Sequence, residues 1–184
     1  MLRYRKRCEP SSRGRKTNVA RPPLNAPELL TEAHEFSGFS CGEANLDQWL
    51  QRRARANQIS GASRTFVVCE GKRVVAFYAL ASSVIAQAEA TGRFKRNMPD
   101  PIPVVVLARL AIDQNFQGQG LGRALFQDAA RRIIFASEVI GIRGLIVHTL
   151  TESAKAFYLA LGMECSPIEP MILMVTLSDL RAAC

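Results

Sequence analysis

Apolar residues follow two spacings in the central part of the chain, and each spacing predicts one kind of element. Residues 104–112 form a nearly unbroken apolar run, which is typical of a buried central strand. After a glycine-rich stretch, apolar side chains recur every three to four positions, which predicts an amphipathic helix. The positions of this stripe are Leu121, Leu125, Ala129, Ile133, Ala136 and Ile140. A buried strand that leads through glycines into a long helix indicates an α/β core.

An earlier helix is predicted by a start signal and an apolar face. Ser40 and Glu43 match a capping box, whose hydroxyl and carboxylate would satisfy free amides at the helix start. The apolar face that follows consists of Leu46, Trp49, Leu50 and Ala54. We therefore expect this helix near the beginning of the folded part, which should start near Pro27.

β-rich runs predict a sheet around the buried strand. Runs over 64–68 and 73–81 are joined by a turn at 70–72, which is typical of a hairpin, and 87–101 is a polar connection. The remaining elements are expected as strands over 144–149 and 171–177 and a helix over 152–161 that Gly162 ends. Because strands and helices alternate in the second half of the chain, part of the sheet should be parallel.

Charge divides the chain into blocks. The net charge is +8, from 24 basic and 16 acidic residues. Residues 1–24 hold eight basic side chains, one acid and no apolar periodicity, so we expect a basic, flexible arm before a single domain over 25–184. Residues 52–109 carry a net charge of +7, after an acidic block at 25–51 with −5. A basic block favours a polyanionic partner, but a solvated surface gives the same pattern.

Composition disfavours several classes of protein. No apolar run approaches the roughly 18 residues that a membrane span needs, and no apolar segment follows the basic start, so we expect neither membrane insertion nor secretion. The five cysteines and two histidines are scattered without a C-x-x-C pair, which supports neither a zinc site nor a disulfide framework. Free thiols indicate a reducing cytoplasm. A cysteine nucleophile is disfavoured because no cysteine adjoins a histidine.

The glycine-rich stretch between the strand and the helix indicates a phosphate-binding loop. It consists of Gln117, Gly118, Gln119, Gly120, Leu121, Gly122 and Arg123. Three glycines in five residues expose main-chain N–H groups beside a helix N-terminus, where they can bind phosphate. The spacing fits neither a dinucleotide fingerprint, which needs Gly where Arg123 stands, nor a P-loop, which needs Lys followed by Ser or Thr. A plain glycine-rich turn is the alternative.

The pattern Gln-x-x-Gly-x-Gly within residues 117–122 resembles the pyrophosphate-binding loop of the Gcn5-related N-acetyltransferases, the GNAT family. The resemblance implies an α/β (α+β) protein with the GNAT fold. This fold has a central mixed sheet of six to seven strands, helices on both faces, and splayed parallel strands that bind acetyl-CoA. It also implies that main-chain groups of Leu110, Ala111 and Ile112 hold the pantetheine arm, while the loop 117–123 holds the pyrophosphate. Helix dipole and amides together would bind phosphate, so no metal is required.

Further motifs spread over residues 30–177 resemble the acetyltransferase toxins of bacterial type II toxin–antitoxin systems. They are Phe39-Ser40-Cys41-Gly42 after His34, Leu107 to Asp113, Gly141 to His148, Ala156-Phe157-Tyr158 and Ser166-Pro167 with Pro170-Met171. The resemblance implies acetylation of the α-amino group of aminoacyl-tRNA, which inhibits translation. It also implies a homodimer and a cognate ribbon-helix-helix antitoxin in the bacterial cytoplasm. The chain departs from this subfamily in residues 1–24, in Met163 where Phe is usual, and in Ile172 where Thr is common.

Tyr158 is the candidate catalytic residue, because the resemblance places the catalytic tyrosine there. A phenol with an ordinary pKa of ~10 can donate a proton to the thiolate that leaves when an amine attacks a thioester. The alternative is an aromatic side chain packed beside Phe157. His148 at a strand end is either a proton relay or, as we favour, a structural hydrogen-bonding residue. No strong base is required, because an α-amine with a pKa of about 7.7–8 is partly neutral at pH 7.

Basic side chains that contact phosphates would bind tRNA. The candidates are Arg52, Arg53, Arg55, Arg93, Lys95, Arg96 and Arg109. Each is alternatively a solvated surface charge, and Arg109 stands apart because it interrupts an apolar strand. Two other functions are open: a GNAT enzyme that acetylates a protein or a small amine, and a non-catalytic nucleic-acid-binding module. The second leaves the glycine loop and Tyr158 unexplained.

Overall fold

A computed structural model describes residues 23–183, and the basic arm predicted at the N-terminus lies almost entirely outside this range. The strands are β1 (Glu28–Leu29), β2 (Arg64–Glu70), β3 (Arg73–Ile85), β4 (Ile102–Ile112), β5 (Gly144–His148), β6 (Glu164–Cys165) and β7 (Ile172–Thr176). The helices are α1 (Ala44–Arg52), α2 (Ala54–Ser60), α3 (Gly92–Lys95), α4 (Leu121–Ala136), α5 (Glu152–Leu159) and α6 (Leu177–Ala183). None of the described helices has the length and apolarity that a membrane-spanning helix requires.

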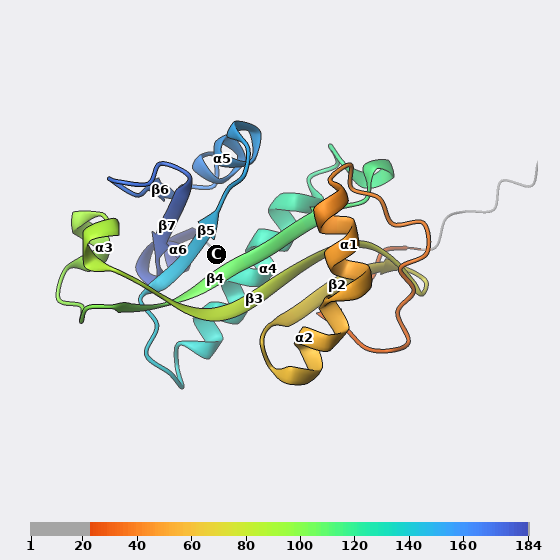
Figure 1. Cartoon of the computed structure of the whole chain (residues 1–184), viewed down its shortest axis with the longest axis horizontal. Helices are drawn as coiled ribbons and strands as arrows, with labels where there is room; N and C mark the ends of the chain where they lie inside the picture. The colour runs from red at the N-terminus through yellow and green to blue at the C-terminus, as the bar shows by residue number, and fades with distance from the viewer. Residues whose placement is uncertain (1–22, 184) are drawn as a thin grey trace, which may run out of the picture.

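The strands form one mixed sheet in the order β1-β2-β3-β4-β5-β7-β6 (Figure 1). Strands β1 to β4 are antiparallel neighbours, β4 and β5 are parallel, and β7 runs antiparallel to both β5 and β6. The predicted hairpin is confirmed by β2 and β3, with Gly71 in the turn at a φ of 65°. The predicted α/β class and the partly parallel sheet are therefore confirmed.

Strands β4 and β5 separate soon after they meet. Their parallel pairing consists of Val105 with Leu145 and Val106 with Ile146. Strand β4 then continues to Ile112, and on that side it pairs with no other strand of the described part of the chain. On its other edge, Ala79 of β3 pairs with Arg109 and Leu80 with Leu107, so Ala108 is the extra residue of a bulge. A bulge increases local twist, which helps β4 to turn away from β5.

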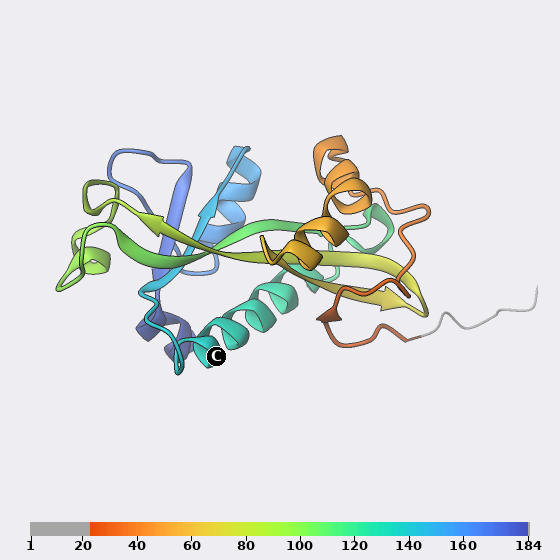
Figure 2. The same ribbon diagram turned by 60° about the horizontal axis from the view of Figure 1, so that its bottom comes forward.

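Helices cover both faces of the sheet (Figure 2), as predicted. On one face, α4 buries Leu125, Ala129 and Ile133, three positions of the predicted stripe, in the largest apolar cluster. On the opposite face, α1 and α2 bury Leu50 and Ala54 in a second cluster. Burial of apolar area in these two layers is the main stabilising contribution to the sheet.

The end of the α4 stripe is a correction to the sequence prediction. The helix ends at Ala136, and Ile140 lies beyond it with 59% of its surface exposed. The Ser137 hydroxyl donates to the Ile134 carbonyl at 2.6 Å, and the Glu138 N–H bonds the Phe135 carbonyl three residues back. The Val139 N–H likewise bonds three residues back, so the chain tightens after Ala136 and the regular helix stops.

The predicted capping box is wrong. Helix α1 begins at Ala44 with Glu43 in the capping position, and Glu43 makes no side-chain capping hydrogen bond. The main-chain N–H of Ser40 instead bonds Asp113, which follows β4 in the sequence by one residue. A long-range contact thus replaced the local one. The short elements β1, β6, α3 and α6 were not predicted, because two to seven residues carry too little periodicity.

Candidate active site

The separation of β4 from β5 leaves a cleft of about 570 Å³. One wall is β4 from Val106 to Leu110, and another is the end of β5 with the loop that follows it. Helix α5 contributes Tyr158, while the beginning of α1 contributes Glu43, Asn45 and Leu46. The cleft is therefore built from three segments that are far apart in sequence, and the glycine loop begins beyond the end of β4.

Tyr158 lines this cleft from the last turns of α5. The helix is started by Thr151, whose hydroxyl accepts a hydrogen bond from the Ala154 N–H at 3.1 Å. The Tyr158 ring is 9% exposed and is held edge-on by Phe157, with ring centroids 5.0 Å apart. Within residues 23–183, no side chain or main-chain group hydrogen bonds its hydroxyl. Burial raises the pKa of Tyr158 well above its usual value, so the phenol stays protonated at neutral pH.

The glycine loop leads into the N-terminus of α4. Gly118 and Gly120 have φ values of 73° and 81°, in the left-handed region that glycine adopts without a Cβ penalty, and Gly120 is the N-cap residue of α4. The first N–H groups of a helix have no intrahelical acceptor, and the helix dipole places partial positive charge beside them. The loop thus has the main-chain geometry of an anion site, and Arg123 lies in the first turn of the same helix.

The side chain of Gln117 supports the loop from within. Its Nε2 donates to the carbonyl of Ile112 and to the carbonyl of Cys41, both at 2.9 Å. Gln119 donates to the Asn115 carbonyl at 3.2 Å. Both amide groups are used inside the protein, so in this structure the loop offers a ligand its main chain rather than these side chains.

The predicted pantetheine-binding segment occupies the unpaired edge of β4. Leu110 lines the cleft, Ala111 is buried beneath α1, and the Ile112 side chain packs beside the glycine loop at Gly122. Because β5 has already diverged, none of the strands within residues 23–183 neighbours this edge of β4. The segment therefore connects the cleft to the glycine loop, and its binding of pantetheine stays a prediction.

Arg109 is the predicted tRNA-binding residue that lies in the cleft. Its guanidinium is 5.6 Å from the centroid of the Trp49 ring, and Trp49 is stacked on Phe77. Its Nη1 donates to the carbonyl of Ala108 at 2.5 Å. Among the described residues, no carboxylate forms an ion pair with it. A half-buried cation without an acidic partner is suited to binding an anionic ligand.

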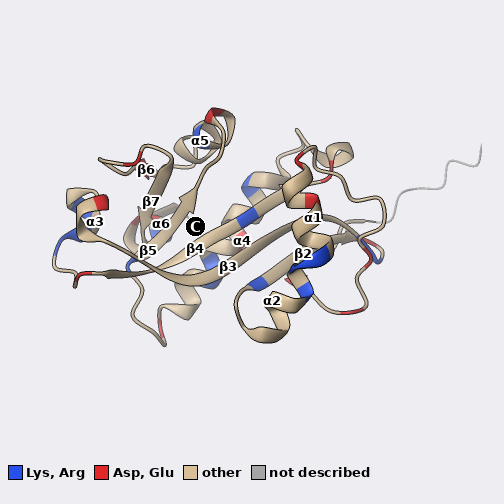
Figure 3. Ribbon diagram, in the orientation of Figure 1, with Lys and Arg blue, Asp and Glu red and all other residues tan. Residues whose placement is uncertain are grey.

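The other predicted cations fall into two separate groups (Figure 3). Arg52, Arg53 and Arg55 lie at α1 and α2, whereas Arg93, Lys95 and Arg96 lie at α3, at the opposite end of the sheet. Two of them already have protein partners. Arg55 donates to the His34 carbonyl at 2.7 Å, and Arg93 forms ion pairs with Glu164 and Asp179.

The cleft also contains residues that sequence reasoning missed. Glu43, Asn45 and Leu150 line it, and nothing in their sequence context indicated a site. Leu46 was assigned to the core and is only half-buried at the rim. His148 lines the cleft and is exposed, and the structural hydrogen bond that we favoured for it is not found within the described residues. These positions become neighbours only because β4 and β5 diverge.

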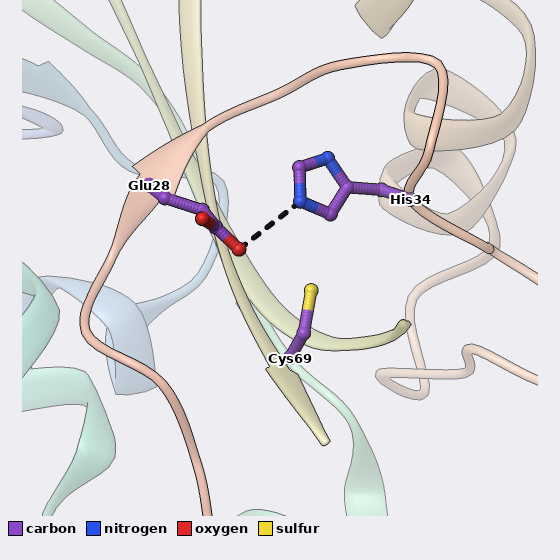
Figure 4. Close-up of side chains that lie close together, drawn as sticks. All are labelled: Glu28, His34 and Cys69. Atoms are coloured by element: carbon purple, nitrogen blue, oxygen red, sulfur yellow. Dashed lines mark hydrogen bonds and ion pairs between the residues drawn. The ribbon is translucent and has the colours of Figure 1, made fainter. Parts of the chain in front are cut away.

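One described cluster has the residue types of a metal site: Glu28, His34 and Cys69 (Figure 4), with ligand atoms within 4.8 Å of one another. The Thr31 N–H donates to His34 Nδ1 at 2.9 Å, so the neutral ring carries its proton on Nε2 and donates it to Glu28 at 3.2 Å. Burial, with the nearby Glu28 charge, raises the pKa of the Cys69 thiol to about 11. Both ring nitrogens of His34 already have hydrogen-bond partners in the protein, which fits a hydrogen-bonded structural unit better than a metal site.

Comparison with known proteins agrees with this geometry. Residues 61–164 match the acetyltransferase (GNAT) domain family. A tRNA-acetylating toxin of Mycobacterium tuberculosis is 48% identical over 158 residues, which cover 86% of this chain and 95% of that protein. A KacT variant with a tyrosine replaced by phenylalanine superposes with a TM-score of 0.82 at 28% identity, covering 88% of this chain and 99% of that one. AtaT complexed with acetyl-methionyl-tRNAfMet superposes with a TM-score of 0.81 at 28% identity, covering 87% of this chain and 98% of that one. The chain belongs to the GNAT family of N-acetyltransferases.

Proposed function

We propose that this enzyme transfers the acetyl group of acetyl-CoA to the α-amino group of an aminoacyl-tRNA and thereby acts as a toxin that inhibits translation. The observation that carries the proposal is the cleft between β4 and β5. A buried phenol lies on one wall, and on another lies Arg109, which has no acidic partner among the described residues. The relative at 48% identity is named a tRNA-acetylating toxin, and the AtaT structure holds acetylated methionyl-tRNA. Both support the same class of acceptor.

Acetyl-CoA would occupy the donor half of the cleft. Main-chain groups of β4 at Leu110, Ala111 and Ile112 would hold the pantetheine arm, and the amides of residues 118–122 would hold the pyrophosphate. Arg123 would add a positive charge at the mouth of the loop. Related structures of AtaT contain acetyl-CoA, which supports this donor. The proposed phosphate binding uses main-chain amides, so the proposal includes no metal.

The reaction needs a neutral amine and a proton for the leaving group. The amine nitrogen forms a bond to the acetyl carbon, the carbon–sulfur bond breaks, and the electron pair leaves on sulfur. The protonated Tyr158 would donate to this sulfur, while the proton lost by the attacking nitrogen returns to the phenolate through solvent. Tyr158 thus acts as the acid. No strong base is required, because an α-amine is already partly neutral at pH 7.

The acceptor would approach over α1. Arg109 of β4 is the cation that lines the cleft. Arg52 at the end of α1 and Arg53 directly after it are exposed. Lys95 and Arg96 offer further phosphate contacts at the far end of the sheet. Arg55 and Arg93 would contribute less, because their guanidinium groups already have protein partners.

The proposal extends to partners. A structure of AtaT contains the C-terminus of its antitoxin, and a KacTA complex contains DNA. We infer that this chain also has a cognate antitoxin of the ribbon-helix-helix class, and that it acts as a homodimer in the bacterial cytoplasm. The basic block at residues 52–109 suits an acidic antitoxin segment.

The decisive experiment offers the purified enzyme a choice of acceptors with labelled acetyl-CoA. Bulk charged tRNA, the same tRNA after deacylation, a protein mixture and small amines are compared side by side. We expect label in charged tRNA alone, released together with the amino acid on mild base treatment. Label in protein or in a small amine, with none in charged tRNA, would favour the alternative GNAT acceptor. No transfer to any acceptor would leave only the non-catalytic reading.

A further inference from the structure

A continuous hydrogen-bonded connection joins the glycine loop to helix α1. Gln117 of the loop donates from Nε2 to the carbonyl of Cys41 at 2.9 Å. The N–H of Cys41 donates in turn to Oδ1 of Asp47, in the first turn of α1, also at 2.9 Å. Cys41 therefore bonds the donor loop with its carbonyl and the acceptor-side helix with its N–H, although the loop lies 76 residues away in sequence.

The segment around Cys41 is pressed against the start of the loop by further contacts. The Gln114 N–H donates to the Ser40 carbonyl at 2.9 Å, and the Ser40 N–H approaches Asp113 Oδ2 at 3.4 Å. Gly42 has a φ of 94°, and a Cβ built there would lie 2.9 Å from the Gln114 side-chain amide. Residues 40–42 and 113–117 are thus joined by several hydrogen bonds and a close contact. We therefore expect a shift of one segment to move the other.

Helix α1 carries this connection to the acceptor half of the cleft. Glu43, Asn45 and Leu46, at and after its start, line the cavity that also contains Tyr158. Asp47 is in the same turn and fixes the direction in which the chain enters the helix. The position of this turn therefore sets the width of the acceptor half, on the wall that faces the end of β5.

We propose that Gln117 and Asp47 are positioning residues that couple occupation of the glycine loop to the placement of α1. The inference rests on the proposed binding of acetyl-CoA at this loop. When the pyrophosphate orders the loop, Gln117 fixes the Cys41 peptide, and Cys41 fixes Asp47 and the first turn of α1. Donor binding then prepares the acceptor half, and a defect in α1 in turn weakens donor binding, because coupling between two sites is reciprocal.

The test is a double-mutant cycle read out by the dissociation constant of acetyl-CoA alone, measured by calorimetry on the full chain. The variants are Gln117→Met, Asp47→Ala and both together. Asp47→Asn keeps an acceptor oxygen for the Cys41 N–H, and Gln48→Ala is the matched control at the exposed neighbouring position of α1. Circular dichroism verifies that each variant is folded.

We expect Asp47→Ala to weaken acetyl-CoA binding about threefold to tenfold, as for loss of one hydrogen bond, although Asp47 is outside the loop. Asp47→Asn and Gln48→Ala should bind like the parent. The double variant should bind no more weakly than the weaker single variant, because both changes break one path. Hydrogen exchange in α1 should slow when acetyl-CoA binds to the parent, and not in Gln117→Met.

Two results would overturn the inference alone: Asp47→Ala binding acetyl-CoA as tightly as Gln48→Ala, or single effects that multiply fully in the double variant. Failure of the parent protein to bind acetyl-CoA at all would instead overturn the proposed function, and the coupling with it. If Asp47→Ala does not fold, Gln117→Met with and without Asp47→Asn still decides the question through hydrogen exchange in α1.

Discussion

Gly122 of α4 lies against the ring of Phe157 of α5, where a Cβ would be only 3.3 Å from the ring edge. The same Cβ would be 3.4 Å from Cδ1 of Ile112, at the end of β4. Phe157 in turn meets Tyr158 edge-on. The start of α4 and the helix that carries the candidate acid therefore touch at a position with no room for a branched side chain.

Replacing Gly122 by valine should damage both stability and chemistry. The added methyl groups must displace Phe157, and overpacking costs about 1–3 kcal/mol, which lowers Tm by about 2–4 °C for each kcal/mol in a chain of this size. Since Tyr158 is held by Phe157, we expect kcat to fall at least ~10-fold. Gly141→Val is the control, because a Cβ at Gly141 meets no atom within 4 Å. If the two variants have the same Tm in thermal melts and the same kcat in acetylation assays, the contact between Gly122 and Phe157 does not support the fold or the reaction.

Tyr158→Phe should separate proton donation from packing. Phenylalanine preserves the ring contacts with Phe157 and Phe126, and the lost hydroxyl has no protein partner among the described residues. Stability and the dissociation constant of acetyl-CoA should therefore stay close to those of the parent. The transfer rate should fall by roughly 10²- to 10⁴-fold, the usual contribution of a positioned acid. Retention of nearly full transfer in a single-turnover assay would remove Tyr158 from the mechanism.

The pH dependence of the reaction should have an ascending limb only. Burial raises the pKa of Tyr158 well above the ordinary phenol value, so the acid stays protonated throughout the working range. The amine must lose its proton, and an α-amine does so below or near pH 8. The profile of kcat/KM should therefore rise and then stay level to pH 10. A descending limb between pH 8 and 10 would show that the essential acid has an unshifted or lowered pKa.

The sequence predicted the fold class and the regular elements because their signals are local. The apolar run before the glycines forms β4, and the three-to-four spacing after them holds where α4 buries Leu125, Ala129 and Ile133. The glycine loop was also predictable, since Gly118 and Gly120 adopt positive φ values that favour glycine. The capping box was predicted wrongly, because it was inferred from local sequence alone. The Ser40 N–H bonds Asp113 instead, 73 residues away, and no capping box forms.

The candidate site was predictable only in part. Tyr158 came from a motif, and its burial and lack of a hydroxyl partner depend on α5 meeting α4. The cation set was identified by charge alone, and charge does not reveal which arginine already has a partner. Arg93 is paired with Glu164 and Asp179, whereas Arg109 in the cleft has no acidic partner among the described residues. Glu43 and Asn45 lie in the cleft through tertiary packing that no short pattern encodes.

Arg109→Gln should weaken the binding of charged tRNA and leave the binding of acetyl-CoA unchanged. Removing a phosphate contact should raise KM for charged tRNA and reduce the slope of log K against log salt by about 1. The dissociation constant of acetyl-CoA should be unchanged, because Arg109 is outside the glycine loop. Arg64→Gln removes the same charge from an exposed position on β2 and is the control. An unchanged salt slope in Arg109→Gln, or the same decrease in Arg64→Gln, would exclude a specific phosphate contact.

Asp113→Asn should reduce stability in a pH-dependent way. The carboxylate is 1% exposed, and although burial alone would raise its pKa, hydrogen bonds from Asn115 and Ser40 and the charge of Arg73 hold the pKa below its usual value. A carboxyl whose folded-state pKa is lowered stabilises the protein above its unfolded-state pKa, and that stabilisation is lost as pH falls through the folded-state pKa.

We expect Asp113→Asn to lose about 2–3 kcal/mol of unfolding free energy at pH 7, because charged hydrogen bonds to buried donors are broken. Below pH 4 the difference from the parent should shrink, which urea titrations from pH 3 to 7 can measure. Glu138→Gln, an exposed position beyond α4, provides the control, and a constant difference across this range would show that the charge of Asp113 does not support the fold.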